Sequence, residues 1–258
     1  MAKVICIANQ KGGVGKTTTA VNLAASMAVA EKKVLLIDID PQGNSTSGVG
    51  LRREGQNGTI YQALLQGSGL KEMVQKTSLS CLDVVVSNTD LIGAEVELIQ
   101  EKDRERKLSL LIREVEADYD YVLIDCPPSL GLLTINSLTA AHSVIIPLQC
   151  EYYAMEGLGQ LLKTIRLIKQ SLNPGLEIEG ILLTMFDSRN NLSHQVAQEV
   201  TRHFKDKVFK TIIPRNVRLS EAPSHGKPVL LYDIHSKGAE SYLNLAKEVM
   251  TNGKTDGD

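Results

Sequence analysis

The densest group of residues that could do chemistry lies near the start of the chain, from Gln10 to Thr18. It reads Gln-Lys-Gly-Gly-Val-Gly-Lys-Thr-Thr, between a short apolar run and an alanine-rich stretch. Glycines let successive backbone N–H groups turn toward one anion, and the start of a helix adds a partial positive charge. A phosphate-binding loop needs this order of strand, glycine-rich turn and helix. The segment therefore predicts a site for nucleotide phosphates.

The two lysines of this segment have different expected roles. We expect Lys16 to reach the β- and γ-phosphates and the Thr17 hydroxyl to hold Mg²⁺. Lys11 begins the loop, and Gln10 stands where the pattern G-x-x-x-x-G-K-[ST] has glycine. Lys11 either projects toward a nucleotide held by a second subunit or faces solvent and raises the local potential. The expected nucleotide contacts are Lys11, Gly12, Gly13, Val14, Gly15, Lys16, Thr17 and Thr18.

Three carboxylates stand at the ends of apolar runs. Asp38 and Asp40 end the run that starts at residue 34, and Asp125 ends the run that starts at residue 121. In an open α/β sheet, ligands bind beyond the carboxyl ends of the strands, so all three are expected beside the phosphate loop. Asp125 best fits an aspartate that binds Mg²⁺ directly or through its water. Asp38 either supports the metal or caps the following turn, and capping is also the structural alternative for Asp40 and Asp125.

Short β-branched apolar runs recur along the chain and are expected to be strands. They are nearly continuous, as is typical of strands covered on both faces, and they span residues 4–8, 34–39, 82–86, 121–125, 143–147, 178–185 and 209–213. Helical stretches lie between most of them, at residues 17–31, 158–172 and 192–205. This alternation indicates βαβ crossovers. We therefore expect a single α/β domain over residues 1–250, with a doubly wound, mostly parallel sheet, and a flexible tail at 251–258.

One charged stretch, residues 91–118, is not assigned any chemistry. It contains eight acidic and five basic residues interleaved with Leu, Ile and Val. Such a pattern is typical of a solvated amphipathic helix with local ion pairs.

Composition narrows the class of protein further. With 258 residues, 43% of them hydrophobic, and a net charge of −2, the chain is neither a uniformly basic DNA coat protein nor a disordered polyelectrolyte. Its four cysteines lack metal-ligand spacing, which argues against zinc or a disulfide framework. No apolar run approaches the roughly 20 residues of a membrane-spanning helix. The N-terminus does not read as a secretory signal, so a cytoplasmic protein is expected.

Several ordered segments carry a family resemblance. The chain contains KGGVGKTTT, VLLIDIDPQGN and YDYVLIDCPPS, followed by CEYYAMEGL, LLTMFDSRNNL and IPRNVRLSEAPSHGKP. In these it resembles the deviant-Walker-A P-loop ATPases, and within them the ParA/Soj chromosome and plasmid partition ATPases. The resemblance covers nearly the whole chain. It implies Mg²⁺-dependent ATP hydrolysis and a nucleotide-sandwich homodimer in which Lys11 contacts the ATP of the partner subunit.

The same resemblance implies roles for residues outside the phosphate loop. Asp40 matches the position that orients the attacking water, and the turn from Cys126 to Ser129 matches a switch that senses the γ-phosphate. Pro214 and Asn216 match the loop that contacts adenine, where Pro packs on the base and Asn offers an amide to its edge. An ordinary strand-to-loop turn is the alternative. Cys126 also suggests an iron–sulfur cluster, because the nitrogenase iron protein shares this loop chemistry, but the cluster segments of that protein are absent from the sequence.

Residues 187–237 form a modestly basic segment. They contain nine Lys/Arg and five Asp/Glu, which suits nonspecific, salt-sensitive contact with phosphates. The resemblance places Arg189 and Arg218 on a DNA-binding face, with Lys205, Lys207, Lys210 and Lys227 as weaker candidates. The alternatives are a solvated surface of mixed charge or, for an arginine, a structural pair with a carboxylate such as Glu221.

Together these features predict an ATP-driven partition switch. Mg²⁺-ATP would close a dimer on nonspecific double-stranded DNA of the nucleoid, and a ParB-type centromere-binding partner would stimulate hydrolysis and release. The chain end lacks the basic amphipathic helix of membrane-binding relatives such as MinD, so no membrane contact is expected. Two alternatives remain: a MinD-like membrane-cycling ATPase, and a nucleotide-sensing regulator with negligible turnover.

Overall fold

The computed structural model describes residues 1–52 and 58–252, which form a single α/β domain around one sheet. The strand order is β3-β4-β2-β5-β1-β6-β7, and every neighbouring pair is parallel except β3 and β4. The predicted doubly wound, mostly parallel sheet is therefore confirmed. The strands are β1 (Lys3–Ile7), β2 (Val34–Asp38), β3 (Val74–Lys76), β4 (Leu82–Val85), β5 (Tyr121–Asp125), β6 (Ser143–Gln149) and β7 (Glu177–Thr184).

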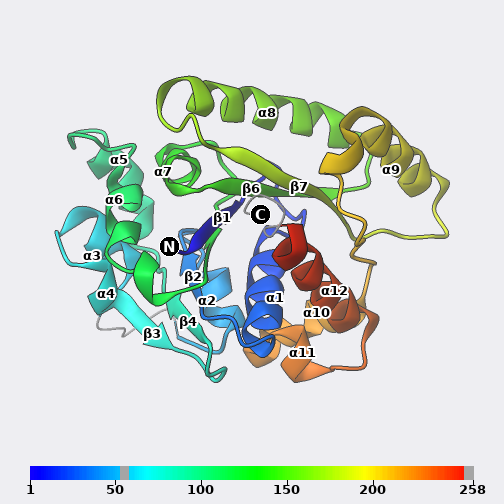
Figure 1. The fold of residues 1–258 in the computed structure, drawn as a ribbon, viewed down its shortest axis with the longest axis horizontal. Coiled ribbons are helices and arrows are strands. Elements are labelled where there is room, and N and C mark those ends of the chain that lie inside the picture. Colours follow the sequence, from blue (N-terminus) through cyan, green and yellow to red (C-terminus); the bar gives the residue numbers. More distant parts are fainter. Residues whose placement is uncertain (53–57, 253–258) are drawn as a thin grey trace.

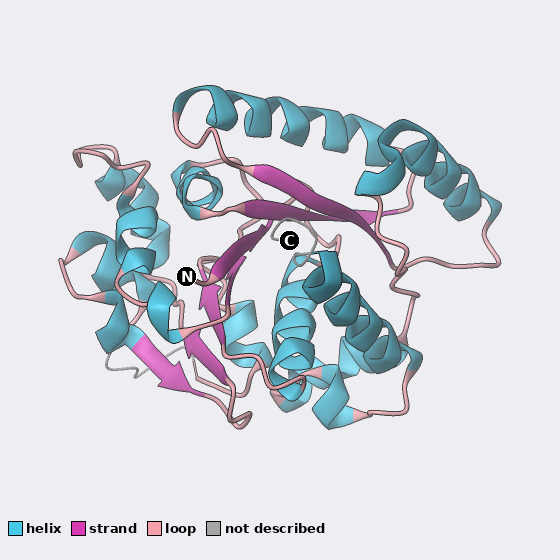
Figure 2. Cartoon of the chain, viewed as in Figure 1, coloured by secondary structure: helices cyan, strands magenta, loops and turns pink. Residues whose placement is uncertain are grey.

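Helices cover both faces of this sheet (Figures 1 and 2). They are α1 (Lys16–Val29), α2 (Asn44–Gly48), α3 (Ile60–Leu65), α4 (Leu70–Met73), α5 (Leu91–Leu98), α6 (Lys107–Arg113), α7 (Leu132–Ala140), α8 (Ala154–Ser171), α9 (Asn191–Phe204), α10 (Val217–Glu221), α11 (Val229–Tyr232) and α12 (Lys237–Asn252). Among the described residues, none of these helices is both long and apolar enough to cross a bilayer.

Successive side chains of the central strands pack into two separate hydrophobic cores, one on each face of the sheet. In β1, Val4 and Cys6 pack in the core that α7 and α8 cover, whereas Ile5 and Ile7 pack in the core that α1 and α12 cover. Both cores are needed because successive side chains of a strand point to opposite faces. This explains why the strands read as continuous apolar runs, and six of the seven expected strands lie within one or two residues of their predicted bounds.

The register of the central strands brings the candidate site together. Asp38 of β2 pairs directly with Asp125 of β5, and Ile7 of β1 pairs with Asp125 on its other side. The carboxyl ends of β1, β2 and β5 are thus level, and the loops that follow them leave from one edge of the sheet.

The seventh expected strand, residues 209–213, was a wrong prediction. Isolated bridges only flank this segment, between Ile181 and Val208 and between Phe186 and Pro214. A carboxylate of α12 explains the interruption, because Glu248 accepts hydrogen bonds from the backbone N–H of Lys210 at 2.7 Å and of Thr211 at 3.0 Å. Those amides are therefore not available for a continuous ladder.

Two further differences concern the charged stretch and the chain end. Residues 91–118 do not form one helix but α5, α6 and a 3-10 turn, and the break includes Asp103 with a φ of 51°. Ion pairs of Arg104 with Glu105 and of Lys107 with Glu101 lie at this break. The short antiparallel strand β3 was missed. The predicted tail begins within α12, and its residues 253–258 lie outside the described residues.

Replacing Glu248 with Ala should lower the free energy of unfolding by about 1–2 kcal/mol, because two backbone N–H groups lose a charged acceptor. Urea denaturation measures this loss. Lys247→Ala is the matched control, since Lys247 is the exposed neighbour on the same helix. Equal stability of the two variants would show that Glu248 does not hold the segment.

Candidate nucleotide site

The phosphate loop connects β1 to α1 and leaves its backbone open to the outside. Gly13 and Gly15 have φ values of +74° and +89°, which side chains with a Cβ rarely adopt. A Cβ added at Gly12 or Gly13 would have no atom within 4 Å. The loop therefore frames an open space next to the first turn of α1, where an anion can meet backbone N–H groups.

Two polar residues that sequence reasoning missed fix this loop to the sheet. Asn9 is buried, and its amide donates to the Pro147 carbonyl at 2.7 Å while its Oδ1 accepts from the Lys11 N–H at 3.0 Å. The hydroxyl of Thr184, at the end of β7, donates to the Val14 carbonyl at 2.8 Å. A polar residue directly after an apolar run, as at Asn9, is the signal that could have identified such an anchor.

Lys16 is held within the site rather than on the surface. Its side chain is buried, and Nζ donates to the Lys11 carbonyl at 3.0 Å across the loop. Burial lowers the pKa of Lys16, while the negative charge of Asp125 opposes this shift. The ammonium group therefore lies between the loop and the carboxylates, as a ligand for β- and γ-phosphates must.

Asp125 is fully buried, and one of its carboxyl oxygens has no hydrogen-bond partner among the described residues. Ser45 donates to its Oδ2 at 2.7 Å, whereas its Oδ1 has no hydrogen-bond partner of acceptable geometry. Burial, followed by the nearby charge of Asp38, raises the pKa of Asp125 to about 8, and the hydroxyls of Ser45 and Thr17 oppose the shift. An oxygen in this state, beside the Thr17 hydroxyl, has the chemistry of a cation ligand.

Asp38 lies next to Asp125 but already has partners for both oxygens. Its Oδ2 accepts from the Thr46 N–H at 2.7 Å and from the Thr46 hydroxyl at 2.8 Å, and its Oδ1 accepts from the Asp40 N–H at 3.2 Å. Burial raises the pKa of Asp38 to about 6, and these hydrogen bonds oppose the shift. The contacts match the turn-capping alternative, while metal support by Asp38 stays a prediction.

Asp40 is positioned differently from the other two aspartates. Its Oδ1 accepts from the Gln42 N–H at 2.9 Å, which fixes the side chain in the turn before α2. Its Oδ2 has no hydrogen-bond partner within residues 1–52 and 58–252. Asp40 thus presents one free oxygen near the phosphate loop.

A cavity of about 370 Å³ lies on the other side of the loop and includes the expected adenine contacts. Pro214 and Asn216 line it together with Thr18, Thr184 and Met185. The Oδ1 of Asn216 accepts from the backbone N–H of Arg218 at 3.0 Å and caps α10. The sequence suggested both a donor and an acceptor, but the acceptor is used by the cap, which leaves the amide NH₂ for a base.

The side chain of Lys11 does not turn toward its own loop. It forms an ion pair with Glu151, which follows β6. A cleft of about 490 Å³ lies beside it, lined by Gln10, Ser129 and Tyr153 among others. Tyr152, which follows Glu151 in the sequence, is 76% exposed. Lys11 thus lies on an outer surface where a second molecule has access.

The two candidate DNA-binding arginines have different surroundings: Arg189 lies in the loop before α9, whereas Arg218 lies within α10. The Phe186 N–H donates to the Ile213 carbonyl, and the Arg215 N–H donates to the Phe186 carbonyl, so the segments that precede them run side by side. The Arg189 side chain is 87% exposed and pairs with Asp187. Arg218 pairs with both Glu221 and Asp233, as the structural alternative required.

Comparisons with known proteins identify the family. A family model described as an AAA domain matches residues 2–178. The chromosome partitioning protein ParA of Myxococcus xanthus is 61% identical over 97% of this chain and 88% of its own length. The sporulation initiation inhibitor protein Soj of Bacillus subtilis is 57% identical over 98% of this chain and 100% of its own. The chain belongs to the ParA/Soj family of chromosome-partitioning proteins.

Solved structures place this ParA/Soj-family chain among nucleotide-binding proteins. Cobyrinic acid a,c-diamide synthase from Mycobacterium smegmatis, solved with a bound ATP analog and magnesium, gives a TM-score of 0.87 at 36% identity and covers 100% of this chain and 98% of that one. The cell division ATPase MinD of Pyrococcus furiosus gives 0.81 at 25% identity and covers 98% and 100%. The recognition of the family and of a P-loop fold from the sequence is confirmed.

Asp125→Asn should change how stability depends on pH in metal-free, nucleotide-free protein. Because the folded-state pKa of Asp125 is raised from 3.8 to about 8, ionising it costs free energy that grows between about pH 4 and pH 8. Asn does not ionise and keeps an acceptor for Ser45. We measure the free energy of unfolding by urea denaturation in the presence of a chelator. Relative to the wild type, that of the variant should rise by up to about 1.4 kcal/mol per pH unit across this window. Parallel stability curves would contradict the raised pKa.

Proposed function

We propose that this ParA/Soj-family protein is an ATP-driven partition switch that hydrolyses ATP. The observation that carries the proposal is the grouping of Lys16, Thr17 and the unpartnered Oδ1 of Asp125 below an open glycine loop. These groups suit a polyphosphate with a bound divalent cation, and the cavity beside Pro214 and Asn216 accepts a base. ATP is therefore the proposed substrate.

Thr17 and Asp125 would hold Mg²⁺, with Asp38 behind them as the residue that fixes the following turn. When bound, Mg²⁺ neutralises charge on the phosphate oxygens. The chain itself contributes the ammonium group of Lys16 and the N–H groups of Gly12 to Thr18, which stabilise the negative charge that develops on the β- and γ-phosphates. Because these donors are fixed before the nucleotide binds, little reorganisation is needed.

Asp40 is proposed to orient the attacking water. Its Oδ1 is fixed by the Gln42 N–H, so its free Oδ2 is available to accept a hydrogen bond from water. Water oxygen bonds to the γ-phosphorus as the bond to the bridging β–γ oxygen breaks, and ADP and phosphate leave. The carboxylate positions the water and does not contact the phosphates.

A second subunit is proposed to complete the site. Lys11 faces outward, and the exposed Tyr152 and Tyr153 lie beside its partner Glu151. In an ATP-bound homodimer, Lys11 would leave Glu151 and contact the nucleotide of the other subunit. Dimer formation would then depend on the γ-phosphate, because Lys11 of the other subunit would neutralise the negative charge that this phosphate adds.

The DNA-bound form is proposed to use Arg189 and Arg218, which follow two segments that are hydrogen-bonded to each other at Phe186 and Arg215. Together the two arginines would make nonspecific contact with duplex phosphates, in a cytoplasmic, nucleoid-associated protein. A ParB-type centromere-binding partner would then stimulate hydrolysis and release. Relatives named as chromosome partitioning proteins support this role.

Asp40→Asn should bind ATP and accumulate as a dimer while losing hydrolysis by about 10²-fold or more. Asn keeps an acceptor for Gln42 but is a weaker acceptor for water. Phosphate release and light scattering on one preparation measure the two properties. Lys16→Ala is the contrasting variant, expected to lose nucleotide binding and stay monomeric. Wild-type turnover in Asp40→Asn would exclude the proposed role of Asp40.

Arg189→Ala should weaken binding to unrelated duplex sequences equally, since phosphates carry no base information. If each subunit loses one phosphate contact, the slope of log affinity against log salt should fall by about 1.8 per dimer. Arg218→Ala should also weaken DNA binding, with ATP affinity measured alongside because Arg218 pairs with Glu221 and Asp233.

Arg166→Ala is the control for both variants, because it also removes one positive charge, at an exposed position of α8. An unchanged salt slope would remove the tested arginine from the DNA-binding face. A joint loss of ATP affinity and DNA binding at Arg218 would assign it the structural role.

A further inference from the structure

The short helix α2 follows directly on the turn that holds Asp40. Within this turn, the Gly43 N–H donates to the Asp40 carbonyl at 2.9 Å, and the Gln42 N–H donates to the Asp40 Oδ1 at 2.9 Å. α2 begins at Asn44, the next residue after Gly43. The position of α2 therefore determines where the carboxylate of Asp40 lies.

Ser45 connects α2 to a different strand of the sheet. Its side chain is fully buried, and its hydroxyl donates to the Oδ2 of Asp125 at 2.7 Å. Asp125 ends β5, whereas α2 follows β2, and the two residues are 80 positions apart in the sequence. This hydrogen bond thus joins the turn of Asp40 to the carboxyl group that is expected to face the cation.

The neighbouring Thr46 makes a different connection. Its backbone N–H and its hydroxyl both donate to Asp38, which ends β2, the strand that leads into the same turn. Its hydroxyl oxygen also accepts from the Ser87 N–H at 3.1 Å. Thr46 therefore fixes α2 against β2 and the segment after β4, and of the two residues it is Ser45 that reaches β5.

We propose that Ser45 is a positioning residue for ATP hydrolysis, because its hydroxyl transmits the position of Asp125 to Asp40. This role rests on the proposed function, in which Asp40 orients the attacking water. Ser45 is too deeply buried to contact the nucleotide, so it acts through α2. Loss of its hydroxyl would release α2 from Asp125, and a displacement of about 1 Å at a reacting group can cost about 10²-fold in rate.

The first test compares steady-state ATP hydrolysis by Ser45→Ala with that by the wild type. We expect kcat to fall by about tenfold to 10²-fold while KM for ATP changes by less than about threefold, since Ser45 helps to align the water and does not bind the nucleotide. Ser45→Cys keeps a side chain of similar size and a weak donor, so its kcat should lie between the two. An equal rise in KM, or wild-type kcat in Ser45→Ala, would overturn the proposal.

Combination with Asp40→Asn shows whether Ser45 acts through Asp40. If it does, Ser45→Ala should slow hydrolysis in the wild type but add less than about twofold to the loss in Asp40→Asn, measured by single-turnover phosphate release. A full additional loss in the double variant would overturn the proposal. Wild-type turnover in Asp40→Asn would instead contradict the proposed function, and this role with it, because that variant keeps Ser45 intact.

A second readout needs neither nucleotide nor metal. Hydrogen exchange, followed by mass spectrometry, reports how firmly α2 is held in the free protein. In Ser45→Ala the backbone N–H groups of α2 should exchange about tenfold faster, as expected for loss of one hydrogen bond to a carboxyl group. Ser47→Ala is the matched control, because the Ser47 hydroxyl, on the same helix, donates to the Gly43 carbonyl at 3.2 Å. Unchanged exchange in Ser45→Ala, or equal acceleration in both variants, would overturn the proposal.

Discussion

Asp38 and Asp125 are buried side by side in register on β2 and β5, and the rest of the site is arranged around their charges. Burial leaves both carboxylates poorly solvated, and the charge of a neighbouring aspartate adds to this effect (Asp40 for Asp38, and Asp38 for Asp125), so both pKa values are raised. The fold satisfies Asp38 with three hydrogen bonds from the turn and α2 but leaves an oxygen of Asp125 unpaired. The structure thus retains an unsatisfied carboxyl oxygen at the point where Lys16 and a cation would meet phosphates.

The parallel sheet makes this concentration of charge possible. All strands of the sheet except β3 run in the same direction. The loops after β1, β2 and β5 therefore leave from one edge. Asn9 and Thr184 then tie the phosphate loop to the ends of β6 and β7. The loop backbone is fixed before any nucleotide arrives, which lowers the entropic cost of binding.

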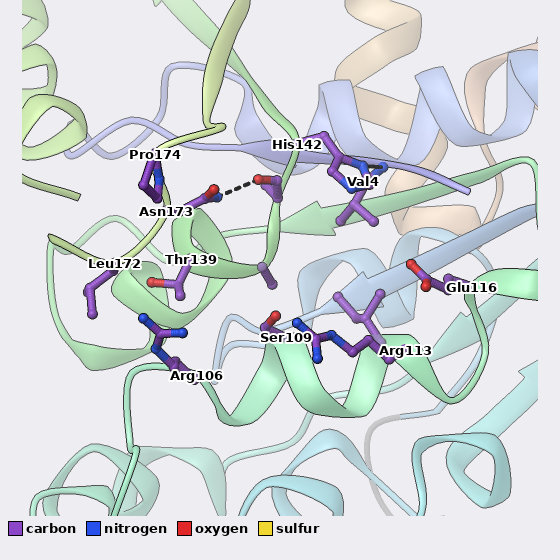
Figure 3. Close-up of a pocket in the computed structure, with 13 residues that line it drawn as sticks. Val4, Arg106, Ser109, Arg113, Glu116, Thr139, His142, Leu172, Asn173 and Pro174 are labelled. Carbon is purple, nitrogen blue, oxygen red and sulfur yellow. Dashed lines mark hydrogen bonds between the residues drawn. The ribbon is translucent and has the colours of Figure 1, made fainter. Parts of the chain in front are cut away.

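The two edges of the sheet differ in chemistry. At the carboxyl edge, the buried Asp38 and Asp125 lie near Lys16, whereas at the amino edge the exposed Arg106 and Arg113 line a cavity (Figure 3). α7 spans the two edges, because it starts after the turn at Pro127 and ends at Ala140 beside that cavity.

The sequence by itself determined the sheet, the phosphate loop and the strand-end aspartates, because continuous apolar runs, glycine spacing and chain direction are local properties. Only the tertiary structure decided which partners complete them. Thr46 holds Asp38, Glu151 holds Lys11, and Glu248 interrupts the expected strand at 209–213. Each of these pairs is distant enough in sequence, or different enough in orientation, that no periodicity indicates it.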